Sequence, residues 1–286
     1  MLWDIAHTTT YHFSRPVHLE SHTIRLRPRC DASQRLDRFE LLIEPRPAGL
    51  SEHLDLEGNC VAQAWFIGVG DSLAVMARSR VETLRPNPFD YVLGDPSADR
   101  LPMAYVDPLE PSLAPYRLRD EPDASVDRFA GSVADEAGGR PLTFLTALNR
   151  RIFQMCQVTI REEGAPLPPR VTLAERRGAC RDLAVLFVDA CRALGLGARF
   201  ASGYHQESPE TEKRDLHAWA EVYLPGGGWR GYDPTHGLAV ADRHVVLAAG
   251  AHPDQAAPIA GTFRGAGVSS RMHAEILIGF PDGAQT

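Results

Sequence analysis

The chain has 286 residues, and its 30 basic and 37 acidic side chains give a formal net charge of -7. Hydrophobic residues make up 44% and charged residues 23%, values typical of soluble globular proteins, which excludes a disordered or fibrous chain. No cluster of Lys and Arg with interleaved aromatic residues stands out, so we expect no nucleic acid partner. A chain of this length has room for two domains, each with its own core.

The N-terminus and the cysteines bear on location. The opening MLWDIAHTTTYHF lacks a basic stretch followed by an apolar core, and no run approaches the roughly 18 apolar residues of a membrane span. The five cysteines are odd in number and include no CxxC pair, which argues against a disulfide framework and a zinc site; they are Cys30, Cys60, Cys156, Cys180 and Cys191. We therefore expect a cytoplasmic protein with no membrane partner.

Residues 1–85 are predicted to form an antiparallel β domain. From about 5 to 83 the sequence favours β-branched and aromatic residues in short period-2 stretches such as HTIRLR, with a turn signal at EGN, 57–59. Residues 86–122 are rich in proline and show neither hydrophobic period, which predicts an extended linker on the surface.

Residues 123–286 are predicted to form a second, catalytic domain of α+β class. Apolar residues recur at three- and four-residue spacing in three segments, which predicts helices near 124–138, 144–153 and 180–194. Strand-like runs follow, and helices followed by a sheet indicate an α+β core. These runs are Ala198 to Tyr204, His217 to Leu224, Trp229 to Tyr232, His244 to Ala248 and Met272 to Ile278.

Three residues in this region have the types and order that thiol acyl transfer needs. Cys180, in RRGACRDLAVLF, lies at the first turn of a predicted helix, where unpaired N–H groups and a partial positive charge favour thiolate and suit an oxyanion. His217 opens the strand HAWAEVYL, and Asp233 ends WRGYD. We expect His217 to act as base and Asp233 to fix its ring orientation. Gly178 should allow a substrate's close approach to Cys180.

The hairpin geometry is the demanding part of this triad. Pairing Leu224 with Trp229 across the PGGG turn places Asp233 opposite Ala220, about 10 Å along the strand from the position facing His217. We therefore expect a bulge after Leu224, and a regular ladder would count against the triad.

Further residues have two interpretations each. Asp182 helps to orient the site or only stabilises the helix N-terminus, and Glu221, which shares a strand face with His217 and Trp219, is a partner of the site or a solvated residue. The loop QESPETEKRD, 206–215, walls the cleft or is a solvated excursion. The remaining histidines are scattered without ligand spacing, so we expect no metal and no cofactor; they include His205, His236, His244, His252 and His273.

The motifs GACRD, RALGLGARFASGY, HAWAEVYLPGGGW and YDPTHG closely resemble those of bacterial transglutaminase-like proteins, in the superfamily that also holds papain-like folds. HTTTYHF, RLRPR and DLEGN resemble the β domain that precedes the core in many such proteins. The resemblance implies a papain-like or transglutaminase-like core, with the nucleophile at a helix N-terminus packed on an antiparallel sheet. It also implies that Cys180, His217 and Asp233 are the catalytic triad. Residues 248–263 depart from the family pattern, and substrate choice is open to change there.

We therefore expect cysteine-dependent acyl transfer or hydrolysis at an amide or peptide bond, through a thioester on Cys180 and with a peptide or amide as substrate. One alternative is an arylamine N-acetyltransferase, which uses the same residue order; the HAWAEV and DPT contexts argue against it. Another is a non-catalytic module that binds a peptide or protein on the same fold. Rapid alkylation of Cys180 would favour the enzyme over this module.

Overall fold

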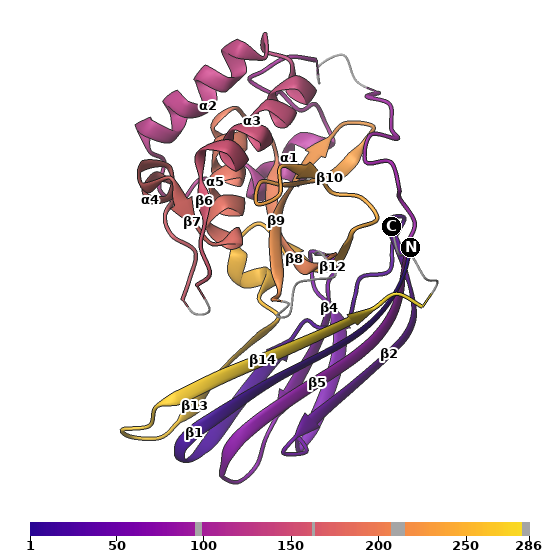
Figure 1. Cartoon of the computed structure of the whole chain (residues 1–286), viewed down its shortest axis with the longest axis vertical. Coiled ribbons are helices and arrows are strands. Elements are labelled where there is room, and N and C mark those ends of the chain that lie inside the picture. The colour runs from indigo at the N-terminus through magenta and orange to yellow at the C-terminus, as the bar shows by residue number, and fades with distance from the viewer. Residues whose placement is uncertain (95–98, 162–163, 207–214, 282–286) are drawn as a thin grey trace.

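The computed structural model describes residues 1–94, 99–161, 164–206 and 215–281. A group of helices covers a five-stranded sheet, and a long curved antiparallel sheet extends below them (Figure 1). This is the expected α+β class, with an N-terminal antiparallel sheet and a separate helical core. Residues 207–214 of the expected cleft loop lie outside the described residues. No helix in the described parts is long and apolar enough to cross a membrane.

The long sheet contains seven strands, in the order β2-β5-β1-β4-β3, with β13 and β14 also pairing with β1. The first five are β1 (Leu2–Ile24), β2 (Gln34–Glu44), β3 (Gly49–Leu54), β4 (Cys60–Trp65) and β5 (Gly70–Thr83). Residues alternate between buried and less buried positions along β1 and β5, as a strand with one covered face requires. Trp3, Leu73 and Val75 lie at the centre of the resulting core.

The C-terminal strands correct the expected domain division. β13 (Ile259–Arg264) and β14 (Ser270–Gly279) both pair antiparallel with β1, so the predicted strand from Met272 to Ile278 belongs to the N-terminal sheet and not to the core. The physical reason is that β1, with 23 residues, is long enough to pair with more than one strand along each edge. β14 also adds Ile276 to the hydrophobic core of this sheet. Residues 123–286 therefore do not form one unit.

The core contains the three expected helices, α2 (Ala124–Glu136), α3 (Pro141–Met155) and α5 (Cys180–Ala193), and the short α4 (Pro169–Glu175). Its five-stranded sheet has the order β11-β10-β9-β8-β12. The strands are β8 (Ala198–His205), β9 (His217–Leu224), β10 (Gly228–Asp233), β11 (Leu238–Ala239) and β12 (His244–Gly250). The small side chains Ala218 and Ala220 of β9 let α5 pack closely on the sheet, as expected from their alternation.

The proline-rich segment 86–122 is not an extended surface linker. It contains α1 (Leu109–Leu113) and a 3-10 helix, η2 (Ala114–Tyr116), and it buries Met103, Tyr105 and Leu113 in the hydrophobic cluster of the core. The Tyr105 hydroxyl donates to the carbonyl oxygen of Tyr223 at 2.9 Å and accepts from the backbone N–H of Gly197 at 2.9 Å. The segment is therefore a strap held on the core, which composition alone did not indicate.

Two amide side chains of the N-terminal part complete the outer edge of β12. The Asn59 side chain, from the expected EGN turn, accepts from the N–H of Ala249 at 2.9 Å and donates to its C=O at 2.8 Å. Gln34 bonds Val246 in the same way, at 2.8 and 2.9 Å. Both amides thus substitute for a neighbouring strand and fix the core sheet on the N-terminal part.

Asn59→Ala should lower the free energy of unfolding by about 2 kcal/mol, because it leaves buried backbone groups of Ala249 without partners. Denaturant unfolding of the full chain measures this loss. Gln154→Ala, on the exposed face of α3, is the control and should change stability by less than about 0.5 kcal/mol. An equal effect of the two substitutions would contradict this role of Asn59.

Candidate active site

Cys180 is the first residue of α5, as expected, and its side chain is half-buried. It follows β7 (Arg177–Gly178), which pairs in parallel with β6 (Gln157–Val158). A Cβ on Gly178 would lie 2.8 Å from the Cβ of Asp182. The missing side chain at this position therefore makes room for Asp182, where the sequence suggested room for a substrate.

Asp182 fixes the backbone that leads into the helix. It is fully buried, and its carboxylate accepts from the N–H of Ala179 at 2.8 Å, from the N–H of Leu167 at 2.8 Å and from Arg161 at 2.5 Å. The bond from the Ala179 N–H is one half of a capping box, and it stabilises the N-terminus of α5 as the second interpretation expects. The same bond holds the residue before Cys180, so one contact agrees with both interpretations.

Asp182→Ala should lower the free energy of unfolding by about 3 kcal/mol or more, because it breaks a buried ion pair and leaves a buried N–H group unpaired. Denaturant unfolding measures the loss, and Asp135→Ala on the exposed side of α2 is the control, with an expected change below about 0.5 kcal/mol. A loss under about 1 kcal/mol for Asp182→Ala would show that the loop does not depend on this carboxylate.

His217 and Asp233 are in direct contact. The Nε2 atom of His217 lies 2.8 Å from Oδ2 of Asp233, and both residues are buried. The Cys180 thiol lies close enough to His217 to help raise the pKa of the imidazole. Because Asp233 occupies Nε2, Nδ1 is the ring nitrogen left for the thiol. The three predicted triad residues are therefore brought together by α5, β9 and β10.

The expected bulge after Leu224 is absent, and that prediction is wrong. β9 and β10 form a regular ladder from Gly228 opposite Leu224 to Tyr232 opposite Ala220. The turn is one residue shorter than assumed, with Gly227 N–H bonding the carbonyl of Leu224 at 2.8 Å.

This one-residue difference in register decides which face of the sheet Asp233 uses. Continuing the regular ladder places Asp233 opposite Trp219, on the same face as His217 and two residues along the strand. Such diagonal neighbours are within reach of long side chains. A regular ladder therefore forms the contact and does not count against the triad.

The electrostatics favour an ion pair. Burial alone would lower the pKa of His217, but the charge of Asp233 and the hydrogen bonds to Asp233 and Cys180 outweigh it and raise the pKa to about 10. Burial alone would raise the pKa of Asp233, but the charge of His217 and three imidazole hydrogen bonds hold it well below its usual value. At neutral pH the imidazole is thus a cation, ready to donate a proton.

These directions predict a pH-dependent stability. A histidine whose pKa is higher in the folded than in the unfolded state stabilises most below its unfolded pKa, near 6.5, and loses that contribution as the pH rises toward about 10. The difference in unfolding free energy between the natural chain and His217→Gln should therefore shrink over this pH interval. Denaturant unfolding at several pH values measures it. A constant difference would mean that His217 is neutral in the folded protein.

Three further histidines surround Asp233, contrary to the prediction that they are scattered. Oδ2 of Asp233 lies 2.9 Å from Nδ1 of His236 and 3.1 Å from Nε2 of His244, and the ring of His205 stacks on that of His236 at 4.2 Å. Each of them lies at or just beyond a strand end. The sequence predicted these strands but not the order that sets β8 between β9 and β12.

The other two histidines named from the sequence, His252 and His273, lie outside this cluster. His252 pairs with Asp120 at 3.3 Å, and His273 lies in β14, opposite Thr10 of the N-terminal sheet. Among the described residues, neither forms a hydrogen bond or ring contact with His217 or Asp233.

Trp219 lies beside the triad, whereas Glu221 bonds elsewhere. Trp219 is fully buried and packs against the rings of His217 and His244, with centroids 6.1 and 5.2 Å away. Glu221 is not brought to the site, because its carboxylate pairs with Arg199 at 2.7 Å. Trp219 therefore lines the buried side of the triad. Glu221 instead holds Arg199, which also pairs with Glu57 between β3 and β4 at 3.7 Å.

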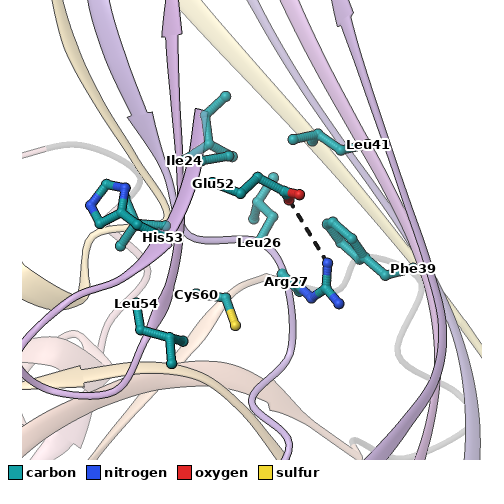
Figure 2. A pocket seen from close by; sticks show the side chains of 11 residues that line it. Ile24, Leu26, Arg27, Phe39, Leu41, Glu52, His53, Leu54 and Cys60 are labelled. Atoms are coloured by element: carbon teal, nitrogen blue, oxygen red, sulfur yellow. Dashed lines mark ion pairs between the residues drawn. The ribbon is translucent and has the colours of Figure 1, made fainter. Parts of the chain in front are cut away.

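A separate cavity of about 230 Å³ lies in the N-terminal part (Figure 2). Its walls come from β1, β2, β3 and β4, and it contains an ion pair between Arg27 and Glu52 at 3.8 Å. None of the predicted catalytic residues lines it. The predicted triad is therefore separate from this cavity.

Two models of known protein families match this chain, one in each of its two parts. Residues 3–82 match the family model described as bacterial transglutaminase-like N-terminal region. Residues 132–234 match the model of the transglutaminase-like superfamily, and this stretch includes Cys180, His217 and Asp233.

Similar proteins extend over nearly the whole chain. An uncharacterized protein of Mycobacterium tuberculosis H37Rv is 29% identical over 272 residues, covering 90% of this chain and 86% of the relative. An uncharacterized protein of Mycobacterium leprae is 25% identical over 281 residues, covering 93% and 94%. A crystal structure from Cytophaga hutchinsonii, of a candidate cysteine protease, has a TM-score of 0.70 at 22% identity and covers 97% of this chain and 90% of that one. The two proteins share a fold.

Proposed function

Because this chain is a transglutaminase-like protein with the bacterial N-terminal region, we propose that it is a cysteine-dependent enzyme acting on amide or peptide bonds. The fold is one used generally for cysteine-based catalysis. The observation that carries the proposal is the contact of His217 with Asp233 at 2.8 Å on one side and with the Cys180 thiol on the other. This arrangement supports the roles of nucleophile for Cys180, base for His217 and orienting carboxylate for Asp233.

In the proposed reaction the thiolate sulfur of Cys180 attacks the amide carbonyl carbon, and the carbonyl oxygen becomes an oxyanion. The N–H of Cys180, in the first turn of α5, is a suitable donor to that oxyanion. As the C–N bond breaks, protonated His217 gives its proton to the leaving amine, which leaves a thioester on Cys180. Neutral His217 then takes a proton from water or an amine, whose oxygen or nitrogen attacks the thioester carbon and releases the thiolate.

Asp233 serves this cycle without exchanging a proton with the substrate. Its buried carboxylate accepts the Nε2–H of His217, so Nδ1 is directed to the sulfur in every step. Trp219 is fully buried and packs beside the His217 ring on its interior side.

We expect the substrate to be a peptide or another amide. The divergent segment 248–263 includes the 3-10 helix η3 (Pro253–Ala256), where Ala256 packs in the same small cluster as Cys180. This placement supports a role of the segment in substrate choice. All five cysteines are free thiols, which supports a reducing, cytoplasmic location.

The test is mass spectrometry of the intact chain after incubation with a library of peptides and amides. We expect an acyl adduct on Cys180 whose mass identifies the donor. Loss of the adduct in buffer alone would identify water as the acceptor, and loss only after an amine is added would identify an amine. Adduct formation from acetyl-CoA in place of amides would support an N-acetyltransferase. Tight binding of peptides without any adduct on Cys180 would support the binding module.

A further inference from the structure

His205 is a buried imidazole that the proposed reaction does not use. It is 7% exposed, and neither of its ring nitrogens has a hydrogen-bond partner among the described residues. A buried polar atom without a partner is costly, and each case calls for an explanation such as a bound water or ion. The ring lies 4.2 Å from His236, 4.5 Å from His244 and 5.4 Å from His217, measured between centroids.

The carboxylate beside it is overcrowded with nitrogen atoms. Three imidazole nitrogens approach the single oxygen Oδ2 of Asp233, at 2.8, 2.9 and 3.1 Å, and the residue has no exposed surface. A carboxylate oxygen offers two lone pairs, so it cannot satisfy three donors equally. Ring nitrogens of His205 and His244 also remain unpaired in the described part of the chain. The cluster therefore holds more coordinating nitrogen than its own hydrogen bonds use.

We propose that His205, Asp233 and His236 form a binding site for a divalent transition-metal ion such as Zn²⁺. One coordinating atom from each of the three lies within 4.8 Å of the others. Two imidazoles and a carboxylate form a donor set suited to Zn²⁺, Co²⁺ or Ni²⁺, whereas Mg²⁺ and Ca²⁺ prefer oxygen.

Zinc bonds of about 2.0–2.1 Å require ligand atoms roughly 3.3 Å apart in a tetrahedral site. His236 Nδ1 and Asp233 Oδ2 lie 2.9 Å apart, somewhat closer than this spacing, so a small side-chain shift brings them to it. His205 stacks on His236 with an angle of 26° between the rings, so it must rotate for its nitrogen to point at the same ion. No hydrogen bond among the described residues opposes that rotation.

A second group, His217 with Asp233 and His244, also brings its coordinating atoms within 4.8 Å. The first group is the better site for two reasons. Its His205 nitrogens are unpaired in the described structure, and the side chain of His236 is 34% exposed, which gives an ion a path from solvent. The side chains of His217 and His244 are 9% and 1% exposed, and both bond to Asp233.

The consequence for catalysis rests on the proposed function. A cation on Oδ2 of Asp233 lowers the negative charge of the oxygen that accepts the Nε2–H of His217. The carboxylate then stabilises the protonated imidazole less, so the metal-bound enzyme should be less active. The site would make the thiol chemistry responsive to the metal supply.

The experiment is calorimetric titration of Zn²⁺ into the Cys180→Ala variant, which removes the thiolate as a competing ligand. We expect one Zn²⁺ per chain, and His205→Phe in the same background should weaken binding by at least about 100-fold. His252→Phe changes a histidine outside the cluster and should leave the affinity unchanged. Circular dichroism checks that each variant is folded.

If His205→Phe does not fold, His236→Gln at the more exposed ligand serves as the second variant and should show the same loss. Unchanged Zn²⁺ binding in a folded ligand variant would overturn the proposal, as would the absence of binding to Cys180→Ala. Failure of the proposed function is a separate result. If the chain binds Zn²⁺ through His205 but forms no adduct on Cys180, the metal site is supported and the proposed enzymatic function is contradicted.

Discussion

Cys180→Ala should abolish formation of the acyl adduct and lower kcat/KM for the amide substrate by at least about 10⁴-fold. The thiolate supplies the only electrons that bond to the substrate carbonyl in the proposed reaction, so no neighbouring group replaces it. The measurement is steady-state turnover of the amide that the adduct experiment identifies, together with the mass of the intact chain. Alanine suits the first position of α5, so we expect the variant to fold.

The controls are substitutions of the two cysteines of the N-terminal part. Cys30, between β1 and β2, is exposed, and Cys60, the first residue of β4, is partly buried. Cys30→Ala and Cys60→Ala should retain turnover within about twofold, as expected for sites outside the chemistry. Residual activity of Cys180→Ala above one tenth of that of the natural chain would refute nucleophilic catalysis by this thiol.

Asp233→Asn should lower kcat/KM by about 10² to 10⁴-fold, because the neutral amide no longer fixes the ring of His217 or stabilises its charge. Loss of the carboxylate also removes the largest influence that raises the pKa of His217, so the pKa should fall. Alkylation of Cys180 at pH 6 should then slow and recover only toward alkaline pH. Turnover and the pH profile of alkylation measure the two effects.

Asp242→Asn is the matched control, since it makes the same change in the nearby segment between β11 and β12 and the Asp242 contact to Thr83 uses the backbone carbonyl. It should leave both the rate and the pH profile unchanged. If Asp233→Asn behaved like this control, His217 would be oriented by another group, and the geometry at Oδ2 would have no catalytic meaning.

The local elements and the three triad residues were predictable from the sequence because their signals are local. Three signals depend only on residues close in the chain: the apolar face of α5, the alternation along β9, and the placement of Cys180 at a helix start. The register of β9 and β10 was not predictable in this way, because one residue more or fewer in the glycine turn reverses the face on which Asp233 lies.

Long-range pairing explains the remaining differences. The sequence predicts a strand from Met272 to Ile278 but not that its partner is β1, more than 250 residues earlier. The clustering of His205 and His244 likewise depends on β8 and β12 being neighbours, a property of sheet order that no spacing along the chain records. Both features therefore required the fold.

In the proposed mechanism, Cys180 is an activated nucleophile paired with His217. The most direct measurement is the rate of alkylation of each cysteine by iodoacetamide between pH 5 and 9, followed by peptide mass spectrometry. We predict single-site labelling of Cys180 at pH 6 to 7, at least about tenfold faster than labelling of exposed Cys30, because only a thiolate reacts. Labelling of Cys180 no faster than that of Cys30 over this range would contradict the account.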